Sequence, residues 1–182
     1  MEIRTQLAIV TTVGLAWGGG NLVRVRPFLH HSAHAERLSL AALEQRVARN
    51  PEDLPATRVL LRRYLELGMP QVVVDQANRA PSAVQQDGVV ALYGARAQEA
   101  LGHVDSANAL VTGALNRCGA IPLELAEGSG CDVRTQTELS LEGAALDLMQ
   151  RWRITPLTDP SRASVAHEMA TRPVRISTRV AW

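Results

Sequence analysis

The sequence predicts an all-α protein with one N-terminal transmembrane helix, a set of antiparallel helical hairpins and a partly extended C-terminal tail. Three observations lead to this prediction: a pattern that repeats at a fixed spacing, a content of only 3% aromatic residues, and a long uncharged run near the N-terminus. Small aliphatic residues with few aromatic ones favour close-packed helices over a sheet. A length of 182 residues suits one domain with appendages.

The repeated pattern lies between Leu54 and Cys118, where Leu67-Gly68 recurs as Leu101-Gly102. Each glycine follows an apolar stripe and can take the left-handed conformation that ends a helix. A helix, a glycine turn and a second helix within a unit of about 34 residues are typical of helical-hairpin arrays. We expect Asn50 to cap the first helix, and Asp105-Ser106 to cap the last helix of the second hairpin. The residues expected to pack the hairpins are Leu60, Leu61, Tyr64, Gly68, Ala77, Ala80, Gly102, Ala107 and Ala114.

This pattern resembles the tetratricopeptide repeat (TPR) family over the stretch from Leu54 to Cys118. The matching positions are Leu60 and Leu61 with Tyr64, the two turn glycines, and the small residues at 77, 80, 107 and 114. The chain departs from the family at Gln98, where an aromatic residue is preferred, and at Gly94-Ala95, where Leu-Gly is preferred. It also lacks the large aromatic residue early in the first helix of each unit. The resemblance implies a scaffold that binds protein partners; an ordinary helical bundle with a coincidental period is the alternative.

The uncharged run extends from Leu7 to Val23, between Arg4 and Arg24. A membrane-spanning helix needs about 20 apolar residues, with about 17 as the lower limit, which this run just reaches. We favour an uncleaved anchor over a cleaved secretory signal, because no clear Ala-x-Ala cleavage site follows the run. The expected partners are therefore the lipid bilayer and other membrane subunits. The residues expected to pack this helix against a neighbour, or to place it at the membrane interface, are Gly14, Gly18 and Trp17.

Two signals disagree about the side of the membrane on which the body lies. Arg24, Arg26 and Arg37 follow the run, which favours a cytoplasmic body. Cys118 and Cys131 are the only cysteines, and a disulfide between them would persist in an oxidising compartment. We favour a periplasmic body.

Catalytic and cofactor chemistry is not indicated. The sequence contains no nucleophile elbow, P-loop, HExxH or haem-attachment motif. The 19 basic and 18 acidic residues nearly balance, which does not support a nucleic-acid partner. His30 and His34 would share a helix face and are weak metal candidates, but no further ligand lies close enough in the sequence to complete a site. We expect no enzyme activity, metal or cofactor.

We divide the chain into an anchor (1–28), a linker with a first amphipathic helix at Ser39–Ala48 (29–50), two TPR-like hairpins (51–121), a loop with a capping helix (122–154) and a tail (155–182). The loop is expected at Ile121–Thr137, the capping helix at Glu138–Arg153, and a short helix from Asp159-Pro160 to Thr171.

The predicted function is that of a non-catalytic, membrane-anchored scaffold, an accessory or assembly subunit of a larger membrane complex. The alternatives are an exported soluble peptide-binding module, and a metal- or haem-associated subunit that uses His30, His31 and His34.

Overall fold

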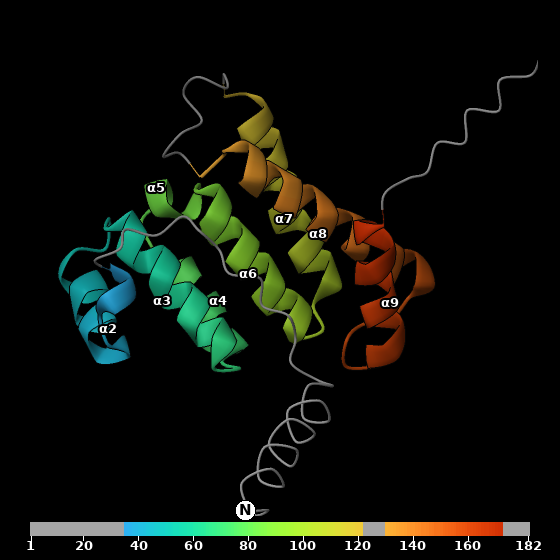
Figure 1. Cartoon of the computed structure of the whole chain (residues 1–182), viewed down its shortest axis with the longest axis horizontal. Helices are drawn as coiled ribbons and strands as arrows, with labels where there is room; N and C mark the ends of the chain where they lie inside the picture. Colours follow the sequence, from blue (N-terminus) through green and yellow to red (C-terminus); the bar gives the residue numbers. More distant parts are fainter. Residues whose placement is uncertain (1–34, 122–129, 173–182) are drawn as a thin grey trace, which may run out of the picture. The chain divides into compact units, whose positions relative to one another are not determined.

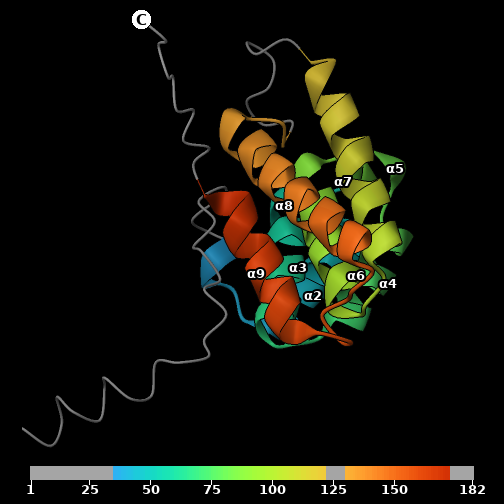
Figure 2. The same cartoon turned by 90° about the vertical axis from the view of Figure 1, so that its right-hand side faces the viewer.

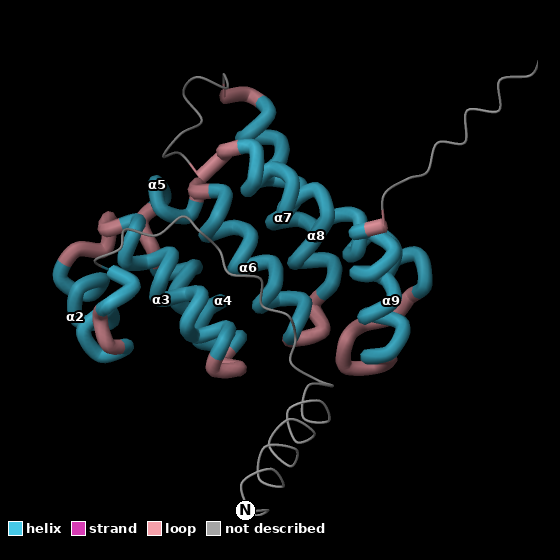
Figure 3. The backbone as a smooth tube through the Cα atoms, viewed as in Figure 1, coloured by secondary structure: helices cyan, strands magenta, loops and turns pink. Residues whose placement is uncertain are grey.

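The computed structural model describes residues 35–121 and 130–172, and these residues form helices and connecting turns without any strand (Figures 1 and 3). The elements are a 3-10 turn at Ala35–Arg37 and the helices α2 (Leu40–Arg49), α3 (Leu54–Glu66), α4 (Pro70–Arg79), α5 (Ser82–Gln85), α6 (Gly88–Ala100), α7 (Val104–Gly119), α8 (Val133–Trp152) and α9 (Pro160–Thr171). The all-α prediction is confirmed for this part of the chain.

Helix α6 lies at the centre of the described residues. It packs against α3, α4, α7 and α8, and ten of its thirteen residues are buried. Figure 2 shows α8 between α7 and α9, which agrees with the packing of α8 on both of those helices. The helices therefore form three successive pairs, α3 with α4, α6 with α7 and α8 with α9, and each pair packs on the next.

The turns inside the first two pairs have the same geometry. Gly68 and Gly102 have φ values of 69° and 80°, so each occupies the left-handed region that favours glycine. In each turn the N–H of the following residue donates to a carbonyl of the preceding helix, at 2.9 Å from Met69 to Tyr64 and at 2.8 Å from His103 to Gln98. The 34-residue spacing of the two glycines in the sequence therefore corresponds to two backbone turns of the same conformation.

The third pair has the same left-handed cap on a different residue, but its connection is longer, because residues 153–159 separate α8 from α9. Arg153 has a φ of 55°, and the N–H of Ile154 donates to the carbonyl of Met149 at 3.0 Å. The spacing from Gly102 to Arg153 is longer than that from Gly68 to Gly102, so a search for a fixed period does not find this turn. The predicted capping helix α8 packs on α6 and α7 of the second pair, and it also forms a further pair with α9.

Two predicted helix caps are wrong. Asn50 ends α2, and Asp53 begins α3 by accepting a hydrogen bond from the Ala56 N–H at 3.0 Å. Helix α7 begins at Val104 without a side-chain cap, and Asp105 lies within its first turn. The chain re-enters a helix directly after the left-handed glycine, which leaves no extended position for a capping side chain.

The predicted loop at Ile121–Thr137 is too long at its C-terminal end. Asp132 caps α8 by accepting from the Thr135 N–H at 3.0 Å, so the helix begins at Val133 and not at Glu138. The apolar stripe of the sequence does not indicate this start, because the first turn of α8 is mostly polar and its one apolar residue, Val133, is 68% exposed. The short helix that ends at Thr171 is confirmed, and its Ala163 and Ala166 are buried against the core.

The predicted packing residues are buried to different degrees. Leu60, Leu61, Ala107 and Ala114 are at most 1% exposed, and Tyr64 is 7% exposed. Ala77 is half-buried, and Ala80 lies one residue beyond α4 as its extended C-cap rather than on the helix.

No helix among the described residues is long and apolar enough to cross a membrane. The predicted anchor with Gly14, Trp17 and Gly18, the histidines at 30, 31 and 34, and the extended tail at 173–182 lie outside those residues.

Replacing Ala114 by leucine should destabilise the protein by about 1–3 kcal/mol, because three extra carbon atoms must enter a fully packed contact between helices. Thr112→Leu on the same helix is the matched control, since Thr112 is exposed. Chemical denaturation should show a lower midpoint for Ala114→Leu and little change for Thr112→Leu. Equal midpoints for Ala114→Leu and the wild type would contradict the close packing of α7.

Candidate functional site

A groove with a volume of about 280 Å³ opens between α4 and α7 over one face of α6. Its apolar lining includes Val90 and Gly94 of α6, Ala77 of α4 and Leu110 of α7. A Cβ atom at Gly94 would lie 3.5 Å from the Leu110 side chain, so the glycine keeps this part of the groove wide. Gly94 is also a position at which the chain departs from the TPR pattern.

Polar groups line the rest of the groove. The amide side chains are those of Asn78, Gln85, Gln86 and Gln98, and Arg117 is the only charged residue among the described residues that line it. Amide groups offer both hydrogen-bond donors and acceptors, as a peptide backbone does. The groove therefore suits an uncharged or mildly acidic peptide segment better than a basic one.

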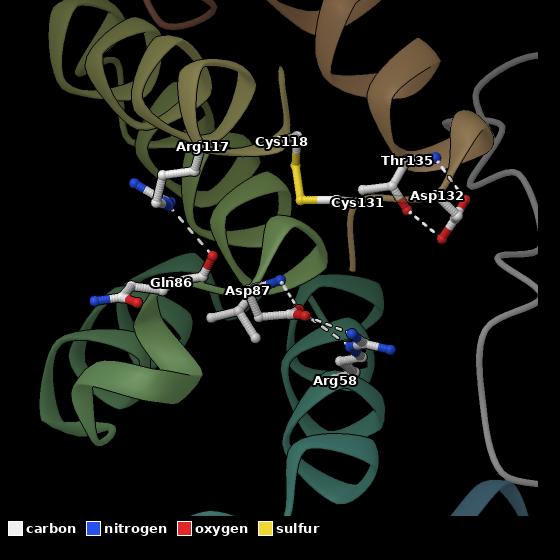
Figure 4. A network of polar contacts seen from close by, with 9 residues as sticks. Arg58, Gln86, Asp87, Arg117, Cys118, Cys131, Asp132 and Thr135 are labelled. Carbon is white, nitrogen blue, oxygen red and sulfur yellow. Dashed lines mark hydrogen bonds and ion pairs between the residues drawn. A yellow bond between two sulfur atoms is a disulfide. The ribbon is translucent and has the colours of Figure 1, made fainter. Parts of the chain in front are cut away.

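Asp87 forms a second feature, a buried polar junction at the start of α6 (Figure 4). Its carboxylate accepts from the Val90 N–H at 3.0 Å, which caps the helix. The same carboxylate accepts from two nitrogens of Arg58 on α3, with the Nε contact at 3.0 Å. The Asp87 side chain is 1% exposed and that of Arg58 is 9% exposed. The ion pair thus joins the first helices of two successive hairpins inside the protein.

The chain that leads into α8 closes over this junction. A Cβ atom on Gly130 would lie 2.1 Å from Asp87 Oδ2, and a Cβ on Gly88 would lie 2.1 Å from the Gly130 carbonyl oxygen, so only glycine fits at either position. The next residue, Cys131, is joined by a disulfide to Cys118 near the end of α7 (Figure 4). The junction therefore brings together α3, α6, α7 and the start of α8.

The role of Asp87 was visible in the sequence but was not recognised. Asp53 occupies the matching position of the preceding hairpin, caps α3, and accepts from Arg46 Nε at 2.6 Å. Both hairpins thus begin with an aspartate that caps its helix and binds an arginine from an earlier helix. A search for repeated polar residues, in addition to apolar ones, would have found this pair.

A third feature is a cluster of titratable side chains where α6, α8 and α9 meet. His167 Nε2 lies 2.7 Å from Glu99 Oε1, and Arg96 Nε donates to Glu142 Oε2 at 3.1 Å. Glu99, Glu142 and His167 each place one potential ligand atom in the cluster, and these three atoms lie within 4.8 Å of one another. No local pattern in the sequence indicates this cluster, because its members lie on three separate helices.

Burial and mutual contact shift the pKa values of these groups in different directions. Desolvation raises the pKa of Glu142 to about 7, against the opposing charge of Arg96. Burial acts most strongly to raise the pKa of Glu99, but the hydrogen bond and charge of His167, a hydrogen bond with Glu142 and the charge of Arg96 together outweigh it, and the pKa is lowered. The hydrogen bond to Glu99 in turn raises the pKa of His167. The cluster therefore holds a proton on Glu142 more strongly than an exposed carboxyl group would.

A scan against protein-family models found no match, and neither did searches of curated proteins and of solved structures. The resemblance to TPR proteins therefore stays a prediction from the residues of this chain.

Replacing Asp87 by asparagine should cost about 3–5 kcal/mol of stability, because Arg58 would keep its charge in a buried site without a carboxylate. Asparagine still caps a helix, so the change tests the charge and not the cap. The repeat supplies the control: Asp53→Asn removes a pair whose arginine side chain is 37% exposed, and should cost at most about 1 kcal/mol. Similar losses for the two variants in urea denaturation would contradict the central role of the buried pair.

The double variant Cys118→Ala/Cys131→Ala should be less stable than the wild type by roughly 3 kcal/mol, because its unfolded chain is no longer cross-linked between these two positions. Thermal unfolding with and without a reducing agent provides the measurement. The reductant should lower the midpoint of the wild type and leave that of the double variant unchanged. If the wild type is insensitive to reduction, the disulfide does not contribute to the stability of the fold.

Proposed function

We propose that the protein is a non-catalytic, TPR-like scaffold, anchored to a membrane by the run Leu7–Val23, that serves as an accessory or assembly subunit of a membrane complex. The observation that carries this proposal is the succession of three helix pairs, in each of which the first helix ends in the same left-handed cap. Arrays of helical hairpins need about three units for stability and expose extended surfaces that bind peptides.

The groove between α4 and α7 supports a peptide as the partner. Its volume is only about 280 Å³, so it fits a segment with alanine, valine or glycine better than one with several large aromatic residues. The Asn78 and Gln86 side chains can bond the main chain of that segment, and Arg117 can bind one carboxylate. We infer that the occupant is a short segment of another protein subunit, with small apolar residues and one acidic residue.

The disulfide supports placement of the body in an oxidising compartment such as the periplasm. Disulfides are rare in reducing compartments, and both cysteines are at most 2% exposed, as expected for a structural bridge. With the anchor at the N-terminus, this placement puts the helical pairs outside the cytoplasm.

The proposal predicts that Leu110→Arg abolishes partner binding while the fold remains intact. Leu110 lines the groove and is 39% exposed, so an arginine there would fill the apolar part with a long charged side chain. Thr112→Arg is the matched control on the exposed face of α7, outside the groove lining. The measurement is extraction of each tagged full-length chain from native membranes in a gentle detergent, followed by mass spectrometry of the proteins that copurify and by N-terminal sequencing.

Membrane subunits that copurify with the wild type and with Thr112→Arg, but not with Leu110→Arg, are the expected result. The same set of proteins with all three chains would exclude the groove as the binding surface. A shortened, water-soluble chain that copurifies with no membrane subunit would overturn the anchored scaffold and favour an exported peptide-binding module.

A further inference from the structure

We propose that Glu99, Glu142 and His167 form a binding site for one divalent transition-metal ion, of which Zn²⁺ is the best-suited example. The site is separate from the peptide groove, and its ligands include none of the histidines at 30, 31 and 34. It would join α6, α8 and α9, which belong to two different helix pairs.

The positions of the ligand atoms fit such an ion. His167 Nε2 and Glu99 Oε1 are 2.7 Å apart, and an oxygen of Glu142 completes a set within 4.8 Å. Zinc binds imidazole and carboxylate ligands at about 2.0–2.2 Å, so two ligands of a tetrahedral ion lie roughly 3.4 Å apart. Side-chain adjustments of about 1 Å would bring the three atoms to that spacing while leaving the fourth position to water.

An unsatisfied buried atom points independently to a missing cation. Glu142 is 4% exposed, and its Oε1 atom has no hydrogen-bond donor among the described residues when both glutamates are ionised. Buried carboxylate oxygens without a donor are costly, and they are stabilised either by a proton or by a metal ion. In the proposed site, the ion supplies the partner that this oxygen lacks.

The charges around the site favour a cation. Glu99, Glu138 and Glu142 supply three negative charges, and Arg96 and Arg134 supply two positive charges through their contacts with Glu138 and Glu142. With a neutral imidazole, one negative charge remains in excess, so the site attracts a cation. Arg96 binds Oε2 of Glu142 and so leaves Oε1 directed to the ion, as outer-shell partners of metal ligands commonly do.

The site is also accessible from solvent on one side. The His167 side chain is 41% exposed, whereas those of Glu99 and Glu142 are 11% and 4% exposed. An ion can therefore enter past the imidazole and reach the two buried carboxylates. One imidazole ligand favours Zn²⁺ over Mg²⁺, which prefers an all-oxygen shell and retains its water.

Zinc titration of the full-length, chelator-treated protein in detergent tests the proposal. Isothermal calorimetry should show a site with a stoichiometry of one ion per chain, and differential scanning fluorimetry should show a raised melting temperature with Zn²⁺ but not with Mg²⁺. The variants His167→Ala and Glu142→Gln should each weaken this binding at least tenfold. Because His167 is partly exposed, His167→Ala should retain the wild-type circular dichroism spectrum.

Two control variants separate this site from other zinc ligands. His103→Ala removes an exposed histidine outside the cluster, and His30→Ala/His34→Ala removes the pair near the predicted anchor. Both should retain the zinc-induced rise in melting temperature. If zinc binding is lost with His30→Ala/His34→Ala, or persists undiminished in His167→Ala and Glu142→Gln, the proposed site is wrong. Absence of any zinc effect on the wild type would overturn it as well.

Discussion

The buried ion pair between Asp87 and Arg58 is the constraint on which the rest of the structure depends. One carboxylate caps α6, binds the guanidinium from α3, and touches the backbone that leads into α8. Two charges removed from water are tolerated only when their hydrogen bonds are satisfied with good geometry. Satisfying them fixes the distance between the first helices of successive hairpins and leaves room only for glycine at position 130. The disulfide then holds the adjacent Cys131 to the end of α7. Polar and covalent contacts therefore determine the register in which the apolar faces pack.

The three helix pairs together bury the central helix α6. Helix α6 packs against α3, α4 and α7 of the first two pairs, and α8 of the third pair covers a further side of α6. The third turn keeps its hydrogen bonds although an arginine replaces the glycine, at a conformational cost of about 1–2 kcal/mol for a left-handed L-residue. The surrounding packing of α8 on α7 and of α9 on α8 must offset that cost. The irregular spacing of the third pair is thus compatible with regular stacking, since each pair contacts only its neighbours.

The sequence predicts the features that recur at fixed spacing and misses those that depend on distant contacts. The left-handed turns at Gly68 and Gly102 and the buried Ala107 and Ala114 follow from local pattern, because helical periodicity is set by nearest neighbours in the chain. The start of α8 was missed since its first turn is polar, with Val133 as its single apolar residue. The cluster of Glu99, Glu142 and His167 was invisible because three separate helices bring it together. The weak metal candidates His30 and His34 lie outside the described residues, so the interpretation of their spacing stays a prediction.

The peptide groove and the proposed metal site share α6 but lie on opposite faces of it. Gly94 and Gln98 line the groove, whereas Arg96 and Glu99 belong to the cluster, and at about 100° per residue the two pairs point in nearly opposite directions. An ion at the metal site could change the affinity of the groove for a peptide only if the protein had two conformations that differ in their contacts at both sites. Helix α6 is buried against four neighbours and is held at its start by Asp87, so it cannot rotate without breaking those contacts. An ion in the cluster would therefore fix the third hairpin to the second and hold the groove in its existing shape. Its role would be that of a structural cross-link in the middle of α8 that complements the disulfide at the start of that helix.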